Sequence, residues 1–213
     1  MALGRAAIVV LAGAALGLSA CGAPGATTAD PAISKKDQIL EPGPLGEREY
    51  GNRNAPVTIV EYVSLTCPHC RNYHAKIFPK VKRQYVDTGK VRYIIREFPI
   101  GRTAGTAALA TRCARKNKHL ALTEAYLSRQ GEWVSQEIRP DAIYGIAKSS
   151  GMSRAEFDKC LSNQSIIDGL TEVKQRGRKY GVIGTPTFFI NGQKLQGAVT
   201  FEEVKALIEP QAS

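Results

Sequence analysis

The chain has 213 residues, of which 43% are hydrophobic and 23% charged, an ordinary balance for a globular protein that excludes disorder throughout. Its formal net charge is +10. The basic residues are dispersed among acidic ones, and the sequence contains no helix-turn-helix, zinc-finger or RNA-recognition pattern, so we expect no nucleic-acid partner.

The first twenty residues have the character of an export signal. One basic residue, Arg5, precedes the uncharged run Ala6–Ala20, which is too short for a comfortable membrane span. The segment Leu18–Gly22 resembles the lipobox of bacterial lipoproteins. We therefore expect residues 1–20 to be removed and Cys21 to carry lipid that anchors the chain to a membrane. A soluble exported protein is the alternative.

A tether and a first strand are predicted next. Residues 21–50 contain mainly small residues and scattered charges without an apolar period, which predicts a flexible tether. Residues 57–63 predict a strand covered on both sides, because apolar side chains occupy both of its alternating faces. Glu61 shares a face with Ile59 and Val63, so we expect its carboxyl group to be buried.

The motif Cys67-Pro68-His69-Cys70 stands directly after this strand and at the start of a helical pattern that runs to residue 86. A helix beginning here would point its unpaired N–H groups and positive dipole end at the Cys67 sulfur, which favours the thiolate. We expect Pro79 to kink this helix. A second strand is predicted over residues 91–98, which implies a parallel crossover.

Only helix signals follow as far as about residue 180. They comprise an alanine-rich stretch through Cys113, the segments 120–127 and 143–147, a capping box of Ser153 and Glu156, and the segment 166–173.

Strand signals return near the end of the chain. Residues 186–190 and 194–199 predict strands joined by the turn Asn191-Gly192, and Thr200 caps a last helix. The order of elements predicts an α/β thioredoxin fold. Its thioredoxin domain would comprise residues 51–102 and 172–208, and residues 103–171 would form an inserted helical domain.

Five cysteines are an odd number for an exported chain. Lipidation accounts for Cys21, which leaves the close pair Cys67 and Cys70 and the distant pair Cys113 and Cys160. In an oxidising compartment we expect Cys113 and Cys160 to form a disulfide, and two buried free thiols are the alternative.

Four features together resemble the DsbA family of periplasmic disulfide oxidoreductases over about residues 50–208: Glu61, the motif Cys67–Cys70, the helical insertion, and the segment Gly184–Gly192. The resemblance implies an enzyme that introduces disulfide bonds into newly exported proteins. It also implies a cis Pro186 that, with Thr185, holds an extended substrate peptide beside the cysteine pair. An ordinary proline at the start of a strand is the alternative.

The resemblance implies unequal roles for the residues of the motif. Cys67 would exchange with substrate sulfur, and Cys70 would be the buried partner that resolves the mixed disulfide. His69 could stabilise the Cys67 thiolate, and Pro68 with His69 favours the oxidase direction. Glu61 could relay the proton of Cys70 or could simply find a polar partner.

A zinc site made of Cys67, Cys70, His74 and His119 is a competing interpretation. Structural zinc usually needs a second close pair of ligands, which the sequence lacks. Haem attachment would require histidine where Arg71 stands. We therefore expect no metal and no other cofactor.

The expected partners follow from the oxidase interpretation. They are reduced exported proteins and a quinone-linked, DsbB-like membrane reoxidase, with the protein a monomer on the periplasmic side of a bacterial membrane. A disulfide isomerase or reductase is the alternative within the same class. A lipoprotein holdase or binding module with structural cysteines is the alternative from another class.

Overall fold

A computed structural model describes residues 34–212, so the expected signal peptide and the expected lipid cysteine, Cys21, lie outside the described residues. A five-stranded sheet in the order β1-β3-β2-β4-β5 forms the centre. Parallel pairing joins β2 and β3, as the crossover predicts, and the other neighbours are antiparallel. The strands are β1 (Arg48–Gly51), β2 (Val57–Val63), β3 (Val91–Glu97), β4 (Thr187–Ile190) and β5 (Gln193–Gln196).

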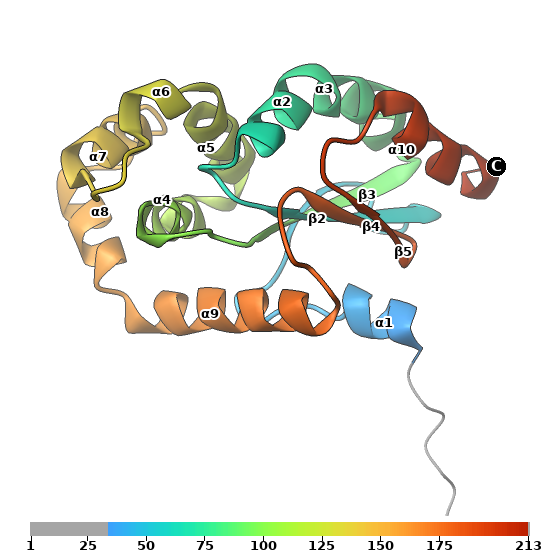
Figure 1. Ribbon diagram of the computed structural model, residues 1–213, viewed down its shortest axis with the longest axis horizontal. Coiled ribbons are helices and arrows are strands. Elements are labelled where there is room, and N and C mark those ends of the chain that lie inside the picture. Colours follow the sequence, from blue (N-terminus) through green and yellow to red (C-terminus); the bar gives the residue numbers. More distant parts are fainter. Residues whose placement is uncertain (1–33, 213) are drawn as a thin grey trace, which may run out of the picture. The chain divides into compact units, whose positions relative to one another are not determined.

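Helices cover both faces of the sheet (Figure 1), which is why all seven residues of β2 are buried. On one face lie α2 (Pro68–Lys76), α3 (Phe78–Val81) and α10 (Phe201–Ile208), over a large apolar core that includes Ile59 and Val63. On the other face lie α1 (Lys35–Leu40) and α9 (Gln164–Lys179), where Val60 and Tyr62 belong to a second, smaller core. The predicted two-sided burial of this strand is confirmed.

The remaining helices gather beyond one end of the sheet (Figure 1). They are α4 (Arg102–Cys113), α5 (Lys116–Ser128), α6 (Gln130–Trp133), α7 (Pro140–Lys148) and α8 (Arg154–Leu161). The capping boxes at Ser153 and Thr200 are both present. The expected boundary at residues 171 and 172 falls inside α9, a single helix that runs from these helices to the face of the sheet.

The predicted tether is wrong in its second half. Between residues 34 and 51 the chain forms α1 and β1, and β1 pairs along its length with β3. Ile39 of α1 is fully buried in the smaller core, and Arg96 of β3 donates to the carbonyl oxygens of Ile39 and Glu41. These contacts join distant parts of the chain, so no local apolar pattern predicts that residues 34–51 are ordered.

The helix predicted over residues 68–86 is interrupted rather than kinked. The first helix, α2, ends at Lys76, and α3 begins at Phe78 with Pro79 in its first turn, where a missing N–H costs nothing. A π-helical turn, Lys82–Val86, follows. At the hairpin, Asn191 and Gly192 have φ values of 46° and 88°, as the predicted tight turn requires.

Within residues 34–212, every helix is too short or too polar to cross a membrane.

Candidate active site

The two cysteines of the motif lie at the first turn of α2 in different environments. Cys67 is the N-cap residue and is half-buried, Pro68 occupies the first helical position, and Cys70 is fully buried. Both cysteines are free thiols. Cys67 lies near the end of the sheet because β2 ends at Val63 and a short loop connects β2 to α2.

Hydrogen bonds lower the pKa of Cys67 to about 5. The largest contribution is the hydrogen bond from the Cys70 side chain. Burial acts in the opposite direction, and Thr185 and the backbone N–H groups of Cys70 and His69 lower the pKa further. The sequence suggested the imidazole of His69 for this task. That side chain is exposed, and the contribution of His69 comes from its backbone N–H.

The neighbouring sulfur is shifted in the opposite direction. Burial raises the pKa of Cys70 well above its ordinary value, and the hydrogen bond to Cys67 and the charge of the Glu61 carboxylate raise it further. Near neutral pH, the reduced pair therefore consists of a Cys67 thiolate and a Cys70 thiol that donates to it.

A loop before β4 forms a wall beside Cys67. The peptide bond between Thr185 and Pro186 is cis, as the resemblance implies. The Cys67 Sγ atom lies 3.1 Å from the carbonyl oxygen of Thr185. Sequence positions separated by 118 residues are thus brought into contact at one end of the sheet.

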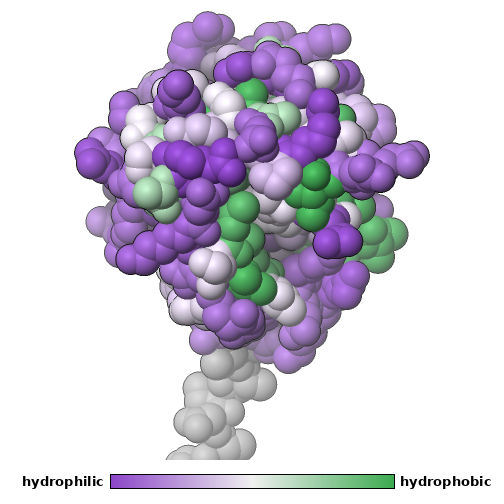
Figure 2. All heavy atoms as spheres, turned by 90° about the vertical axis from the view of Figure 1, so that its left-hand side faces the viewer, coloured by the Kyte–Doolittle hydropathy of each residue, from purple (hydrophilic) through white to green (hydrophobic). Residues whose placement is uncertain are grey.

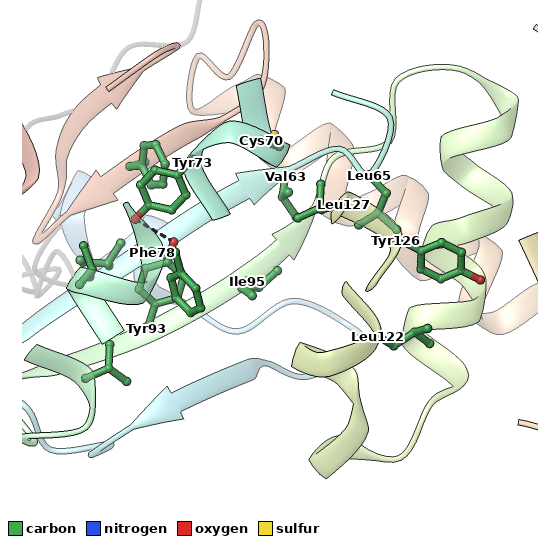
Figure 3. Packing of buried hydrophobic residues seen from close by; sticks show 14 of the residues in the cluster. Val63, Leu65, Cys70, Tyr73, Phe78, Tyr93, Ile95, Leu122, Tyr126 and Leu127 are labelled. Atoms are coloured by element: carbon green, nitrogen blue, oxygen red, sulfur yellow. Dashed lines mark hydrogen bonds between the residues drawn. The ribbon is translucent and has the colours of Figure 1, made fainter. Parts of the chain in front are cut away.

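Glu61 lies under the cysteine helix in a buried polar network. Its carboxylate is fully buried, with His74 Nε2 at 3.0 Å and the hydroxyl of Tyr93 donating at 2.7 Å. The hydroxyl of Tyr73 lies 3.3 Å from that of Tyr93, and because the single Tyr93 proton goes to Glu61, Tyr73 is the donor in this second hydrogen bond. Figure 3 shows these two tyrosines below Cys70, joined across the core between α2 and β3.

His74 belongs to this network. Because its Nε2 atom faces both carboxylate oxygens of Glu61, at 3.0 and 3.2 Å, that nitrogen is the donor. His119, the other suggested zinc ligand, contacts Glu97 and Tyr50 instead. Within residues 34–212, no group of three or more His, Cys, Asp or Glu side chains is arranged to hold a metal ion.

The helices beyond the sheet hold the loop that carries the site. Gln130 of α6 donates through Nε2 to the carbonyl oxygens of Leu65, at 2.8 Å, and Cys67, at 3.0 Å. The sequence pattern predicts neither α6 nor a role for Gln130. A helix of four residues has too little apolar period to be recognised, and the role of the amide depends on a loop 65 residues away.

A second buried polar cluster joins the sheet to α4 and α5. The Glu97 carboxylate accepts hydrogen bonds from Arg112 at 2.7 Å and from His119 at 3.0 Å. Burial raises the pKa of Glu97, but the charge of Arg112 and the hydrogen bond from His119 outweigh it and lower the pKa to about 2. This cluster was also missed, because its members are ordinary charged residues in separate elements.

Cys113 and Cys160 lie apart from the redox motif. They form a disulfide with a Cα–Cα distance of 6.1 Å, which ties the end of α4 to α8 across 47 residues of sequence. The structure therefore brings together Cys67, Pro68, His69, Cys70, Glu61, Thr185 and Pro186, and it separates Cys113 and Cys160 from them.

Comparisons with known proteins agree with this geometry. A family model described as thioredoxin matches residues 45–210. A Rickettsia typhi protein named as a candidate protein-disulfide oxidoreductase is 36% identical over 146 residues, which cover 67% of this chain and 53% of the relative. Disulfide bond formation protein D of Bacillus subtilis is 26% identical over 178 residues, which cover 79% of this chain and 78% of that protein.

Solved structures include the same architecture. The crystal structure of alpha-DsbA1 from Wolbachia pipientis matches with a TM-score of 0.75 and 27% identity, over 84% of this chain and 96% of that one. The chain spans about half the length of its Rickettsia relatives. The matches and the fold agree on one conclusion: the chain belongs to the thioredoxin family, as a DsbA-like member with a thioredoxin fold and added helices.

Proposed function

We propose that the protein is a thiol–disulfide oxidoreductase that introduces disulfide bonds into reduced exported proteins through Cys67 and Cys70. The observation that carries the proposal is the placement of the two sulfurs, with Cys67 half-buried at the start of α2 and Cys70 fully buried beside it, which lowers the pKa of Cys67 to about 5 and raises that of Cys70. A stabilised Cys67 thiolate stabilises the reduced enzyme, and this makes the disulfide form a strong oxidant.

The reaction would begin with the Cys67–Cys70 disulfide. A substrate thiolate attacks the Cys67 sulfur, the bond between the two enzyme sulfurs breaks, and Cys70 leaves as a thiolate that takes a proton. A second substrate thiolate then attacks the substrate sulfur of the mixed disulfide and releases Cys67 as its thiolate. The substrate gains one disulfide, and the enzyme gains two electrons.

The surroundings support a role for each neighbouring group. The half-exposed Cys67 is the sulfur that a substrate can reach, and Thr185 and the cis Pro186 would hold an extended peptide beside it. Glu61 lies beneath the helix and raises the pKa of Cys70, so it would relay the proton that Cys70 takes up and gives back. Pro68 and His69 form the first turn of α2, and backbone N–H groups of this turn point toward the Cys67 sulfur.

The names of relatives support the same class of activity. The Rickettsia typhi relative is named for protein-disulfide oxidoreduction, and the Bacillus subtilis relative is named for disulfide bond formation. Reduced exported proteins are the substrates that this chemistry fits. A quinone-linked, DsbB-like membrane protein would remove the two electrons, with the protein acting as a monomer.

The reduction potential of Cys67 and Cys70 tests the direction of the reaction. Equilibration with a glutathione series, read by trapping of free thiols, should give a value near about −120 mV, the level of a strong oxidase. A value near about −270 mV, the level of thioredoxin, would contradict the oxidase and favour a reductase. An intermediate value with reshuffling of scrambled substrates would favour an isomerase.

A holdase or binding module with structural cysteines remains the alternative from another class. It predicts a Cys67–Cys70 disulfide that resists the glutathione series altogether. The half-exposure of Cys67 and its low pKa favour the redox function instead.

We further propose that Cys21 carries lipid and holds the protein on the periplasmic side of a bacterial membrane. The support is the sequence alone, Leu18–Gly22 after an apolar run. Replacing Cys21→Ser should move the protein from the membrane fraction to the soluble fraction of the cell envelope. Continued membrane association of the variant would contradict a lipid anchor at this residue.

A further inference from the structure

A cavity lies between α4 and α9, apart from the cysteine motif. Its volume is about 460 Å³, and Pro99 and Arg102, in the segment that follows β3, form part of its wall. Thr171 and Gln175 of α9 lie opposite. The cavity is therefore built from the first helix beyond the sheet and from the helix that covers one of its faces.

The charges around this cavity are all of one sign. Arg102, Lys174 and Arg178 line it, and no lining residue is acidic. Neither Arg102 nor Arg178 has an ion-pair partner among residues 34–212, and both are exposed. Burial lowers the pKa of Lys174, and the charge of Arg178 lowers it further. An anionic group would relieve this repulsion.

The cavity also has an apolar part. Leu170 is buried, and Leu109 and Ile167 are half-buried on facing helices. Space is open above Gly105, where an added Cβ would meet nothing within 4 Å. Seen from the end of the molecule that carries the added helices, several apolar patches lie among hydrophilic residues (Figure 2). Such a lining suits an occupant that carries both an anionic group and an apolar group.

Two loops connect the cavity to the cysteine site. Ile100, between lining residues Pro99 and Gly101, donates its N–H to Ser64 Oγ at 3.2 Å, and its carbonyl oxygen accepts from Thr66 Oγ1 at 3.5 Å. Thr66 immediately precedes Cys67.

The second loop follows the end of α9. It begins shortly after Arg178 and leads to Thr185 at the Cys67 sulfur. Each loop exposes one large apolar side chain, Ile100 at 50% and Ile183 at 80%. An exposed apolar side chain therefore lies on each of the two loops between the cysteine site and the cavity.

We propose that the cavity between α4 and α9 binds an acidic and apolar segment of the polypeptide whose cysteine reacts at Cys67. The inference rests on the proposed function and gives it a substrate preference. A chain held at Thr185 and Pro186 extends past one of the two loops, and a Glu or Asp a few residues from its cysteine then meets Arg102 and Arg178. The neighbouring apolar side chain packs on Leu109 and Leu170.

Matched peptides test this preference. Each peptide carries two reduced cysteines and a Glu-Leu pair placed two, four, six or eight residues away, and in its partner Gln replaces Glu. The oxidised full-length protein is mixed with each peptide, and the peptide disulfide is quantified after acid quenching. At low salt, we expect the Glu peptide to react about fivefold faster than the Gln peptide at one spacing, and we expect high salt to remove the difference.

Variants of the cavity connect the preference to these residues. Replacing both Arg102→Gln and Arg178→Gln, or filling the cavity with Gly105→Leu, should bring the ratio of Glu to Gln rates close to one. Gly145→Leu is the matched control, because Gly145, like Gly105, is a helical glycine with open space around it, and it lies in α7. This control should keep the ratio of the parent protein.

The possible outcomes separate the two proposals. Equal rates for Glu and Gln peptides at every spacing would overturn the inference and leave the oxidoreductase intact. Lack of oxidation of every peptide would overturn both. Binding of dodecanoate that is lost in Gly105→Leu, with equal peptide rates, would assign the cavity to an anionic lipid and overturn the peptide as its occupant.

Discussion

At the scale of single residues, exposure and hydrogen bonding give two cysteines of one motif opposite properties. Cys67 is half-buried and accepts hydrogen bonds from Cys70 and from backbone N–H groups at the start of α2. Cys70 is buried over Glu61. Only the first sulfur is therefore both charged and reachable near neutral pH.

The first prediction concerns the titration of Cys67. The rate of alkylation of the reduced protein by iodoacetamide should rise with pH through a midpoint near 5, because the thiolate is the reactive form. In Cys70→Ala, the midpoint should move to higher pH, since the largest cause of the low pKa is lost. A free thiol has a pKa of about 8.5, and a midpoint at that value in the folded parent protein would contradict this account.

The same shift makes stability depend on pH. A pKa lowered by folding stabilises the reduced folded state above the ordinary thiol pKa, and this contribution is lost as pH falls toward 5. We expect the free energy of unfolding of the reduced protein, relative to Cys67→Ala, to rise by about 2 kcal/mol between about pH 5 and 8, with half-exposure of Cys67 taken into account. Urea unfolding of both proteins at several pH values measures this difference.

The second prediction concerns the carboxylate beneath the cysteines. Glu61→Gln keeps the shape and an acceptor but removes the charge, so the pKa of Cys70 should fall while burial keeps it above its ordinary value. Carbon-13 NMR of the Cys70 Cβ atom in both proteins measures the shift.

Tyr93→Phe is the matched control for this experiment. It removes one hydrogen bond to Glu61 and leaves the charge, so Cys70 should keep a high pKa while stability falls by about 1–2 kcal/mol. Identical titration of Cys70 in the parent protein and in Glu61→Gln would show that the carboxylate does not act on this sulfur.

At the scale of elements, the close approach of α9 to the sheet holds one face of β2. A Cβ atom at Gly177 would lie 2.8 Å from Tyr62 Cε1 and 3.2 Å from Phe98 Cδ2. Both rings belong to the smaller core, and Tyr62 is fully buried. The helix can lie this close because residue 177 has no side chain.

The third prediction follows from that contact. Gly177→Ala should lower the free energy of unfolding by about 1–3 kcal/mol, because buried rings must move to accept the methyl group. Gly145→Ala in α7 meets nothing within 4 Å and should instead raise it by about 0.5–1 kcal/mol through helix propensity. Equal effects of the two substitutions in thermal unfolding would contradict a close contact at Gly177.

At the scale of the whole molecule, two connections hold the added helices together and to the sheet. The buried Glu97 cluster joins β3 to α4 and α5, and the Cys113–Cys160 disulfide joins α4 to α8. The loop of the cysteine motif is in turn held by Gln130 of α6. The helices therefore form part of the support of the redox site.

The fourth prediction concerns this disulfide. Replacing both Cys113→Ala and Cys160→Ala should lower the free energy of unfolding by about 4 kcal/mol, because a loop of 47 residues is no longer closed in the unfolded chain. The parent protein with Cys113 and Cys160 reduced is the control and should come close to the variant when Cys67 and Cys70 are reduced in both. Alkylation of Cys67 should keep its midpoint near pH 5, since the disulfide lies apart from that site.

Local patterns were sufficient for most elements of the fold. The alternation of β2, the two capping boxes and the turn at Asn191 are short-range features that survive in the structure. The failures lie where long-range contacts decide. Pairing with β3 stabilises β1, and Ile39 is buried in the smaller core. Gln130 of α6 contacts the loop that carries Cys67.

The sequence by itself determined the class of this protein, because the position of Cys67 and Cys70 after a strand, and of Thr185 and Pro186 before another, is a matter of order along the chain. Only the tertiary structure decided how the sulfurs differ. It placed the Cys70 side chain and the N–H of His69 at the Cys67 sulfur, His74 and Tyr93 at Glu61, and three cations around one cavity. Distances across the fold set pKa values and binding preferences, and these distances depend on how all the elements pack.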